Sequence, residues 1–110
     1  MASNYGYQLT SRAVDDVNDI VSYLSVELGN PAAATGFMDL LQSAIAEIRA
    51  FPQSGPRVAN EFLPSNQVRK IVINNYVMYY QPHPETEMIS ILRVVYGKRD
   101  INEILKKLEL

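Results

Sequence analysis

Residues 68–96 contain the feature that most restricts how this chain can fold: three segments rich in Val, Ile, Tyr and Met. They cover residues 68–73, 76–81 and 87–96, and Asn74–Asn75 and residues 82–86 separate them. β-Branched and aromatic side chains in runs of this length, bounded by turn residues, are typical of adjacent strands. The pattern predicts a three-stranded antiparallel meander with a two-residue turn at Asn74–Asn75.

The two-residue turn determines which side chains of the first two strands share a face. One face would carry Arg69, Ile71, Ile73, Tyr76, Met78 and Tyr80, and the other would carry Val68, Lys70, Val72, Val77, Tyr79 and Gln81. Both sets are largely apolar. Because apolar sheet faces must be removed from water, we expect a cover on each side of the sheet.

Two amphipathic helices are predicted before the meander. The first covers residues 12–28 and follows Thr10–Ser11, a pair suited to N-capping; the second begins at Asn30–Pro31 and ends before Pro52. The expected buried positions are Val14, Val17, Val21, Leu24 and Leu28 in the first helix, and Phe37, Leu40, Leu41, Ala44, Ile45, Ile48 and Phe51 in the second. Together they form a hairpin that covers one sheet face.

The second sheet face has two alternative covers. One is a short C-terminal helix over residues 101–110, with Asp100 and Glu103 as a capping box. The other is a partner chain. With a further strand over residues 5–9, the expected class is α+β, in the order strand, helix, helix, strand, strand, strand, helix. The helical hairpin packs on a mainly antiparallel four-stranded sheet, and residues 1–110 form a single domain.

The composition excludes several kinds of site. The chain has no cysteine and one histidine, so we expect no disulfide, no typical zinc site and no cofactor. Asp15, Asp16 and Asp19 are interpreted as first-turn carboxylates and solvated charges of the first helix rather than as a metal site. Without a membrane-length apolar run or a signal-like start, the expected location is the cytoplasm, with no membrane partner.

The net charge of −2 argues against a general nucleic-acid-binding surface. Residues 1–56 hold two basic and six acidic residues, whereas residues 57–110 hold eight basic and six acidic residues. The basic character of the chain therefore lies in its second half.

The element order and five short segments resemble the RelE/ParE toxin superfamily. The segments are AVDDV at 13–17, FPQSG at 51–55, VRKI at 68–71, NYVMYY at 75–80 and ILRVVYGKRD at 91–100. The resemblance implies a toxin of the plasmid-stabilisation type, which a cognate antitoxin neutralises. The toxin would contact operator DNA only through that antitoxin. One branch of the superfamily cuts messenger RNA in the ribosome, and the other, ParE-like, inhibits DNA gyrase.

The ribonuclease branch needs several cations to stabilise the phosphorane formed in RNA cleavage. Lys70 and Arg99 match two of its basic positions. Val72, Val77 and Leu105 occupy positions where that branch carries two further basic residues and a tyrosine. The resemblance therefore favours the ParE-like branch, whose members inhibit growth by binding gyrase. Tyr96 departs from the pattern of that branch, which often has a histidine at this position.

The alternative is a ribosome-dependent messenger RNA endonuclease with an atypical active site that includes Arg69. Its candidate catalytic residues are Lys70, Arg93 and Arg99, and the candidate binding residues in either case are Lys70, Arg93, Tyr96, Lys98 and Arg99. Arg93 is either paired with an acidic residue or presented at an open face. Arg69 is interpreted as structural, and His83 as a loop residue out of reach of any catalytic partner.

Overall fold

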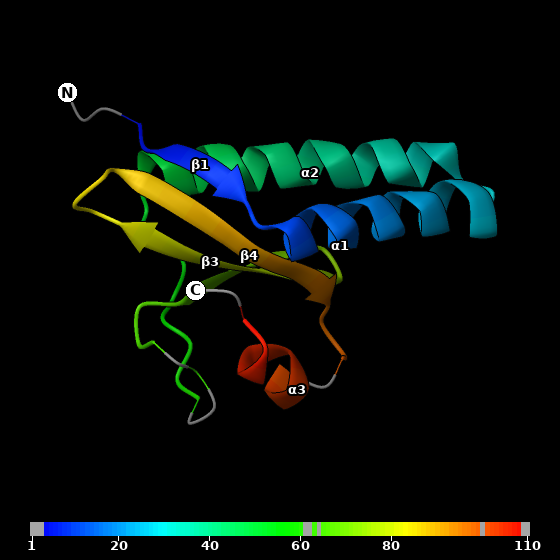
Figure 1. Ribbon diagram of the computed structural model, residues 1–110. Coiled ribbons are helices and arrows are strands. Elements are labelled where there is room, and N and C mark those ends of the chain that lie inside the picture. Colours follow the sequence, from blue (N-terminus) through cyan, green and yellow to red (C-terminus); the bar gives the residue numbers. More distant parts are fainter. Residues whose placement is uncertain (1–3, 61–62, 64, 100, 109–110) are drawn as a thin grey trace.

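The computed structural model describes residues 4–60, 63, 65–99 and 101–108, and within them a mixed sheet lies between two helical layers (Figure 1). The elements are β1 (Gly6–Leu9), α1 (Ser11–Ser22), the π-helical turn η1 (Tyr23–Glu27), α2 (Pro31–Ala50), β2 (Arg69–Ile73), β3 (Tyr76–His83), β4 (Met88–Tyr96) and α3 (Ile101–Lys106). The strand order is β1-β4-β3-β2, with β1 parallel to β4 and the other pairs antiparallel. The predicted class and element order are confirmed.

The register of β2 and β3 is the one that a two-residue turn requires. Ile73 pairs with Tyr76 and Val72 with Val77, so Asn74 and Asn75 alone connect the strands. Asn74 has φ 56°, a left-handed conformation that asparagine tolerates and that primed hairpin turns need. The predicted division of side chains between the two faces therefore holds.

The helical hairpin covers one face of the sheet, as α1 and α2 do in Figure 1. The core on this side joins Val17 of α1 and Phe37 and Leu41 of α2 to Met78 and Ile91 of the central strands. Thr10 caps α1 by accepting a hydrogen bond from the Ala13 amide, and Asn30 caps α2 in the same way. These caps confirm the predicted helix starts.

The opposite face carries a second core under α3. Ile104, Leu105 and Leu108 pack against Tyr79 and Leu92, and Val58 from the loop before β2 joins them. Of the two covers that the sequence allows, the structure shows the C-terminal helix of the chain itself. The predicted capping residue Asp100 lies outside the described residues.

The first helix departs from the predicted uniform helix over residues 12–28. After α1 the chain widens into η1, in which the Leu28 amide donates to the Tyr23 carbonyl. The extra residue in this turn rotates the apolar pattern away from the core. Leu28 is consequently 56% exposed, and the prediction that it is buried is wrong.

Three further side chains in the predicted apolar stripes are exposed. Val14 and Leu40 lie at the outer margins of their stripes. Phe51 is 68% exposed because α2 ends at Ala50 and the Phe51 backbone is no longer helical (φ −135°, ψ 81°), so its side chain leaves the helical face.

The loop between α2 and β2 is attached to the sheet by Tyr80. Its buried hydroxyl donates to the Pro52 carbonyl and accepts from the Gly55 amide, both at 3.0 Å. A side chain at Gly55 would collide with the Lys70 carbonyl, so glycine is required there. Arg69 donates to the Gly55 carbonyl at 2.7 Å, which agrees with a structural role for this arginine.

The edge of β4 changes partner halfway along the strand. β1 pairs with β4 only as far as Leu9 opposite Ile91. Beyond that point Thr10 donates its hydroxyl to the Leu92 carbonyl at 2.9 Å. A β-bulge occurs here, because Tyr79 pairs with Arg93 and Tyr80 with Ile91. Helix α1 thus takes the place of a neighbouring strand.

Asp16 completes this junction. Its carboxylate accepts from Nε and Nη2 of Arg93 at 2.7 and 3.0 Å and from the Val94 amide at 3.0 Å. The Asp16 and Arg93 side chains are 12% and 11% exposed. The prediction that Asp16 is a solvated first-turn carboxylate is therefore wrong: α1 begins at Ser11, and the sheet edge supplies Asp16 with three donors.

The α3 core yields a test of stability. We expect Leu105→Ala to lower the free energy of unfolding by about 2–5 kcal/mol, because it leaves a cavity where the side chain is fully buried. Ile101→Ala, in the same helix but 36% exposed, should cost about 1 kcal/mol or less. Urea unfolding followed by circular dichroism measures both; equal costs would contradict the assignment of α3 as a core element.

The Asp16 junction yields a second test. Asp16→Ala removes the carboxylate that binds the mostly buried Arg93 guanidinium and the Val94 amide, and we expect a loss of about 3–5 kcal/mol in unfolding free energy. Asp16→Asn keeps one acceptor oxygen and should cost less. The exposed neighbour Asp15 provides the control, since Asp15→Ala should stay within about 0.5 kcal/mol of the parent. A similar loss in both alanine variants would count against the junction.

Candidate binding site at the end of β4

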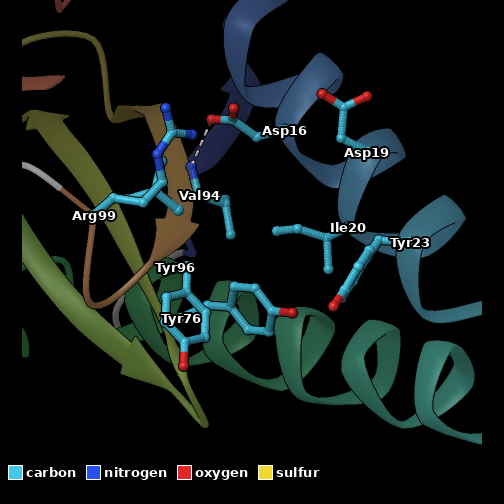
Figure 2. Close-up of a pocket in the computed structure, with 9 residues that line it drawn as sticks. Asp16, Asp19, Ile20, Tyr23, Tyr76, Val94, Tyr96 and Arg99 are labelled. Carbon is cyan, nitrogen blue, oxygen red and sulfur yellow. Dashed lines mark hydrogen bonds between the residues drawn. The ribbon is translucent and has the colours of Figure 1, made fainter. Parts of the chain in front are cut away.

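A cleft of about 450 Å³ lies between the α1–η1 segment and the ends of β3 and β4. Figure 2 shows its two walls. One wall carries Asp16, Asp19, Ile20 and Tyr23, and the other carries Tyr76, Val94, Val95, Tyr96 and Arg99. The cleft is therefore mainly aromatic and aliphatic, with carboxylates on one side and a guanidinium on the other.

Three tyrosines give the cleft its chemical character. Tyr76 contacts Tyr96 edge-to-face, with ring centroids 6.0 Å apart, and packs on Phe37 of α2 at 5.1 Å. Burial raises the pKa of Tyr76, and the nearby Tyr23 and Tyr96 phenols raise it further. Tyr76 is thus a neutral phenol at physiological pH, suited to hydrogen bonding and ring contacts rather than to holding a negative charge.

The end of β4 brings together three of the predicted binding residues. Tyr96 is 43% exposed, and Lys98 and Arg99 follow in the exposed turn before α3. Arg99 lines the cleft and also a second cavity between α1 and α3. Arg93 lines that second cavity as well, with Asp16 as its partner. Of the two alternatives for Arg93, the structure shows the paired one.

Lys70 is separated from this group. It pairs with Tyr79 across β2 and β3, and Tyr79 pairs with Arg93 across β3 and β4. Since adjacent strands are about 4.8 Å apart, the backbones of Lys70 and Arg93 lie about 10 Å apart. The Tyr79 ring, 2% exposed, lies between them, and burial raises the pKa of its phenol.

The three apolar residues at ribonuclease positions have different surroundings. Leu105 is fully buried under the sheet, and Val77 packs at the margin of the same core. Val72 is 69% exposed on the edge strand. This face therefore presents a hydrophobic core where a cluster of cations would be needed for RNA cleavage.

The sequence interpretation missed several residues of the site. Asp16 had a usable signal, because it stands three residues after Ala13 and next to Val17, on the buried side of α1. Tyr23 had none, because its position depends on the π-helical turn. Asp19, Tyr76, Arg12 and Lys107 reach the two cavities only through the tertiary arrangement.

His83 is better connected than predicted. It ends β3, its Nε2 lies 3.1 Å from the Ser90 hydroxyl, and its Nδ1 lies 3.8 Å from the Glu85 carboxylate. The prediction that it is a loop residue with no base or nucleophile within reach is wrong, because β3 extends to His83 and the hairpin register places Ser90 beside it.

Two structural absences hold for the described residues. They contain no group of three or more His, Asp or Glu side chains placed to hold a metal ion. Among them, no helix combines the length and hydrophobicity needed to span a membrane.

Comparisons with known proteins agree with this architecture. Two solved structures share the fold at 17% sequence identity each. One is from the chromosomal ParDE TA system of P. aeruginosa (TM-score 0.67, covering 88% of this chain and 100% of that chain). The other is from the toxin–antitoxin complex RelBE2 of Mycobacterium tuberculosis (TM-score 0.61, 84% and 98%). No curated protein is significantly similar in sequence.

The family model gives a more specific result. It describes the ParE toxin of the type II toxin–antitoxin system parDE, and it matches residues 7–101. This match extends from β1 to the start of α3 and includes both walls of the cleft. The chain therefore belongs to the ParE toxin family.

Proposed function

We propose that this ParE-family toxin arrests growth by binding DNA gyrase in the cytoplasm, without cutting RNA, and that a cognate antitoxin neutralises it. The observation that carries the choice between gyrase and RNA is the apolar character of the sheet face under α3. Leu105 and Tyr79 are buried there, and Tyr79 stands on β3 between Lys70 on β2 and Arg93 on β4. Several converging cations are what RNA cleavage would require at this place.

The surface at the end of β4 supports a binding mode of action. Tyr96, Lys98 and Arg99 are exposed together, next to the cleft. Aromatic side chains and arginines are the residues that most often dominate the binding energy of protein interfaces. We place the contact with gyrase here.

The exposed side of the helical hairpin supports a second partner. Four large apolar side chains of the hairpin are exposed: Tyr23, Val26 and Leu28 in or just after η1, and Leu40 in α2, at 51%, 72%, 56% and 47% exposure. Exposed apolar side chains close together in the chain, as Tyr23, Val26 and Leu28 are, can form a surface that a partner protein covers. The related RelBE2 toxin was solved in complex with its antitoxin. We assign this surface to the antitoxin, through which the toxin would also reach operator DNA.

The gyrase hypothesis is tested by a supercoiling assay with purified gyrase and toxin. We expect the parent protein to inhibit supercoiling, and the double variant Lys98→Ala, Arg99→Ala to need about tenfold or more protein for the same inhibition, because two interface cations are lost. Arg57→Ala, an exposed arginine in the loop before β2, should inhibit like the parent.

Two outcomes would overturn the hypothesis. One is undiminished gyrase activity at excess parent toxin. The other is cleavage of messenger RNA in a translating extract that Arg99→Ala abolishes, which would establish the endonuclease alternative.

A further inference from the structure

A second cavity of about 250 Å³ lies where α1, β4 and α3 meet, next to the tyrosine-lined cleft. Four basic side chains line it, together with Glu103 and Ile104: Arg12, Arg93, Arg99 and Lys107. They come from the start of α1, from β4, from the turn after β4 and from the residue that follows α3. We call this cavity the basic pocket.

The charge of the basic pocket contrasts with that of the whole chain, which is −2. Within the part of the chain that the structure describes, Arg12, Arg99 and Lys107 form no ion pair. The pocket also has acidic neighbours: Asp16 is paired with Arg93, and Glu103 lies 3.6 Å from Lys106. Three like charges around one small cavity repel one another, and a bound anion would relieve that repulsion.

The geometry favours a phosphate group over a carboxylate. A phosphate presents several acceptor oxygens in different directions, so donors from separate elements can bind it together. Guanidinium groups bind phosphate oxygens in bidentate fashion, and of the three cations outside the Asp16–Arg93 pair two, Arg12 and Arg99, are arginines. The cavity is smaller than the range of about 300–1,000 Å³ typical of whole-ligand sites, so it suits one group of a larger molecule.

Arg99 connects the basic pocket to the rest of that molecule, because it lines the 450 Å³ cleft as well. The cleft holds Tyr23, Tyr76 and Tyr96, whose rings can contact a nucleobase, and the exposed carboxylate of Asp19 can accept from base amino groups. We propose that the basic pocket binds the phosphate of a nucleotide whose base lies in the tyrosine-lined cleft. The nucleotide is either free or part of a single strand.

Binding is measured by isothermal titration calorimetry with inorganic phosphate, GMP and a single-stranded deoxyguanosine pentanucleotide. We expect GMP to bind at least about tenfold more tightly than phosphate, because only GMP uses the cleft. Arg12→Gln and Lys107→Gln should each weaken phosphate and GMP by about tenfold or more, since each removes a charge-assisted contact. Tyr23→Ala should weaken GMP by about fivefold or more and leave inorganic phosphate unchanged.

The control is Arg57→Gln, which changes the net charge equally at an exposed position away from both cavities. It should bind all three ligands like the parent. Tighter binding of the pentanucleotide than of GMP would identify a nucleic-acid strand as the phosphate source, and tighter binding of GMP would identify a free nucleotide. Either result supports the proposal if the Arg12→Gln and Lys107→Gln variants bind the preferred ligand more weakly than the parent does.

Three results would overturn the proposal. The first is no binding of GMP or phosphate at millimolar concentration, and the second is binding that persists in Arg12→Gln and Lys107→Gln variants of unchanged circular dichroism. The third comes from a parallel titration with an acidic peptide: tighter binding of that peptide than of GMP. The last would make the pocket a carboxylate site for a protein partner. The assay contains only this chain and its ligand, so its outcome is independent of gyrase inhibition.

Discussion

The arrangement of the molecule depends on the contact between Asp16 and the second half of β4. Because β1 has four residues and β4 has nine, β4 would have an unpaired edge beyond Ile91. Buried backbone groups without partners are costly, so a helix must supply what a strand does not. Asp16 does so for the Val94 amide and holds Arg93 at the same time. This contact therefore determines the position of α1 relative to the sheet. It also determines the shape of both cavities, because Asp16 lines the tyrosine-lined cleft and Arg93 lines the basic pocket.

The second constraint is that both faces of the sheet are apolar. A face that must pack against α3 cannot also present converging cations to RNA, because uncompensated charges are expensive to bury. Leu105 satisfies the packing requirement. The chemistry open to this chain therefore lies at the end of the sheet, around Tyr96 and Arg99, where the side chains reach solvent. This arrangement supports the proposal that the toxin acts by binding, through the side chains at this end of the sheet.

Much of the fold could be predicted because its signals are local. The alternation along β2 and β3 and the turn at Asn74–Asn75 determine the register, and the register determines both faces. Tyr96 and Arg99 were named as candidate binding residues through the family resemblance, and the structure places both at the tyrosine-lined cleft. The rest depends on contacts between distant segments: Asp16 and Arg93 are 77 residues apart, and no periodicity links them. The π-helical turn η1 was missed because one extra residue per turn leaves the composition of the segment unchanged.

The charge of the chain shows most clearly where sequence reasoning stops. A net charge of −2 argues against a broad basic face, since such a face usually comes with an overall excess of cations. It says nothing about a pocket, because a few cations suffice there and can come from anywhere in the chain. Arg12 belongs to the acidic half of the sequence, yet it lines the same cavity as Lys107. A site that neutralises one phosphate releases few counterions, so its affinity should depend on donor geometry more than on salt, unlike that of a protein that follows a nucleic-acid backbone.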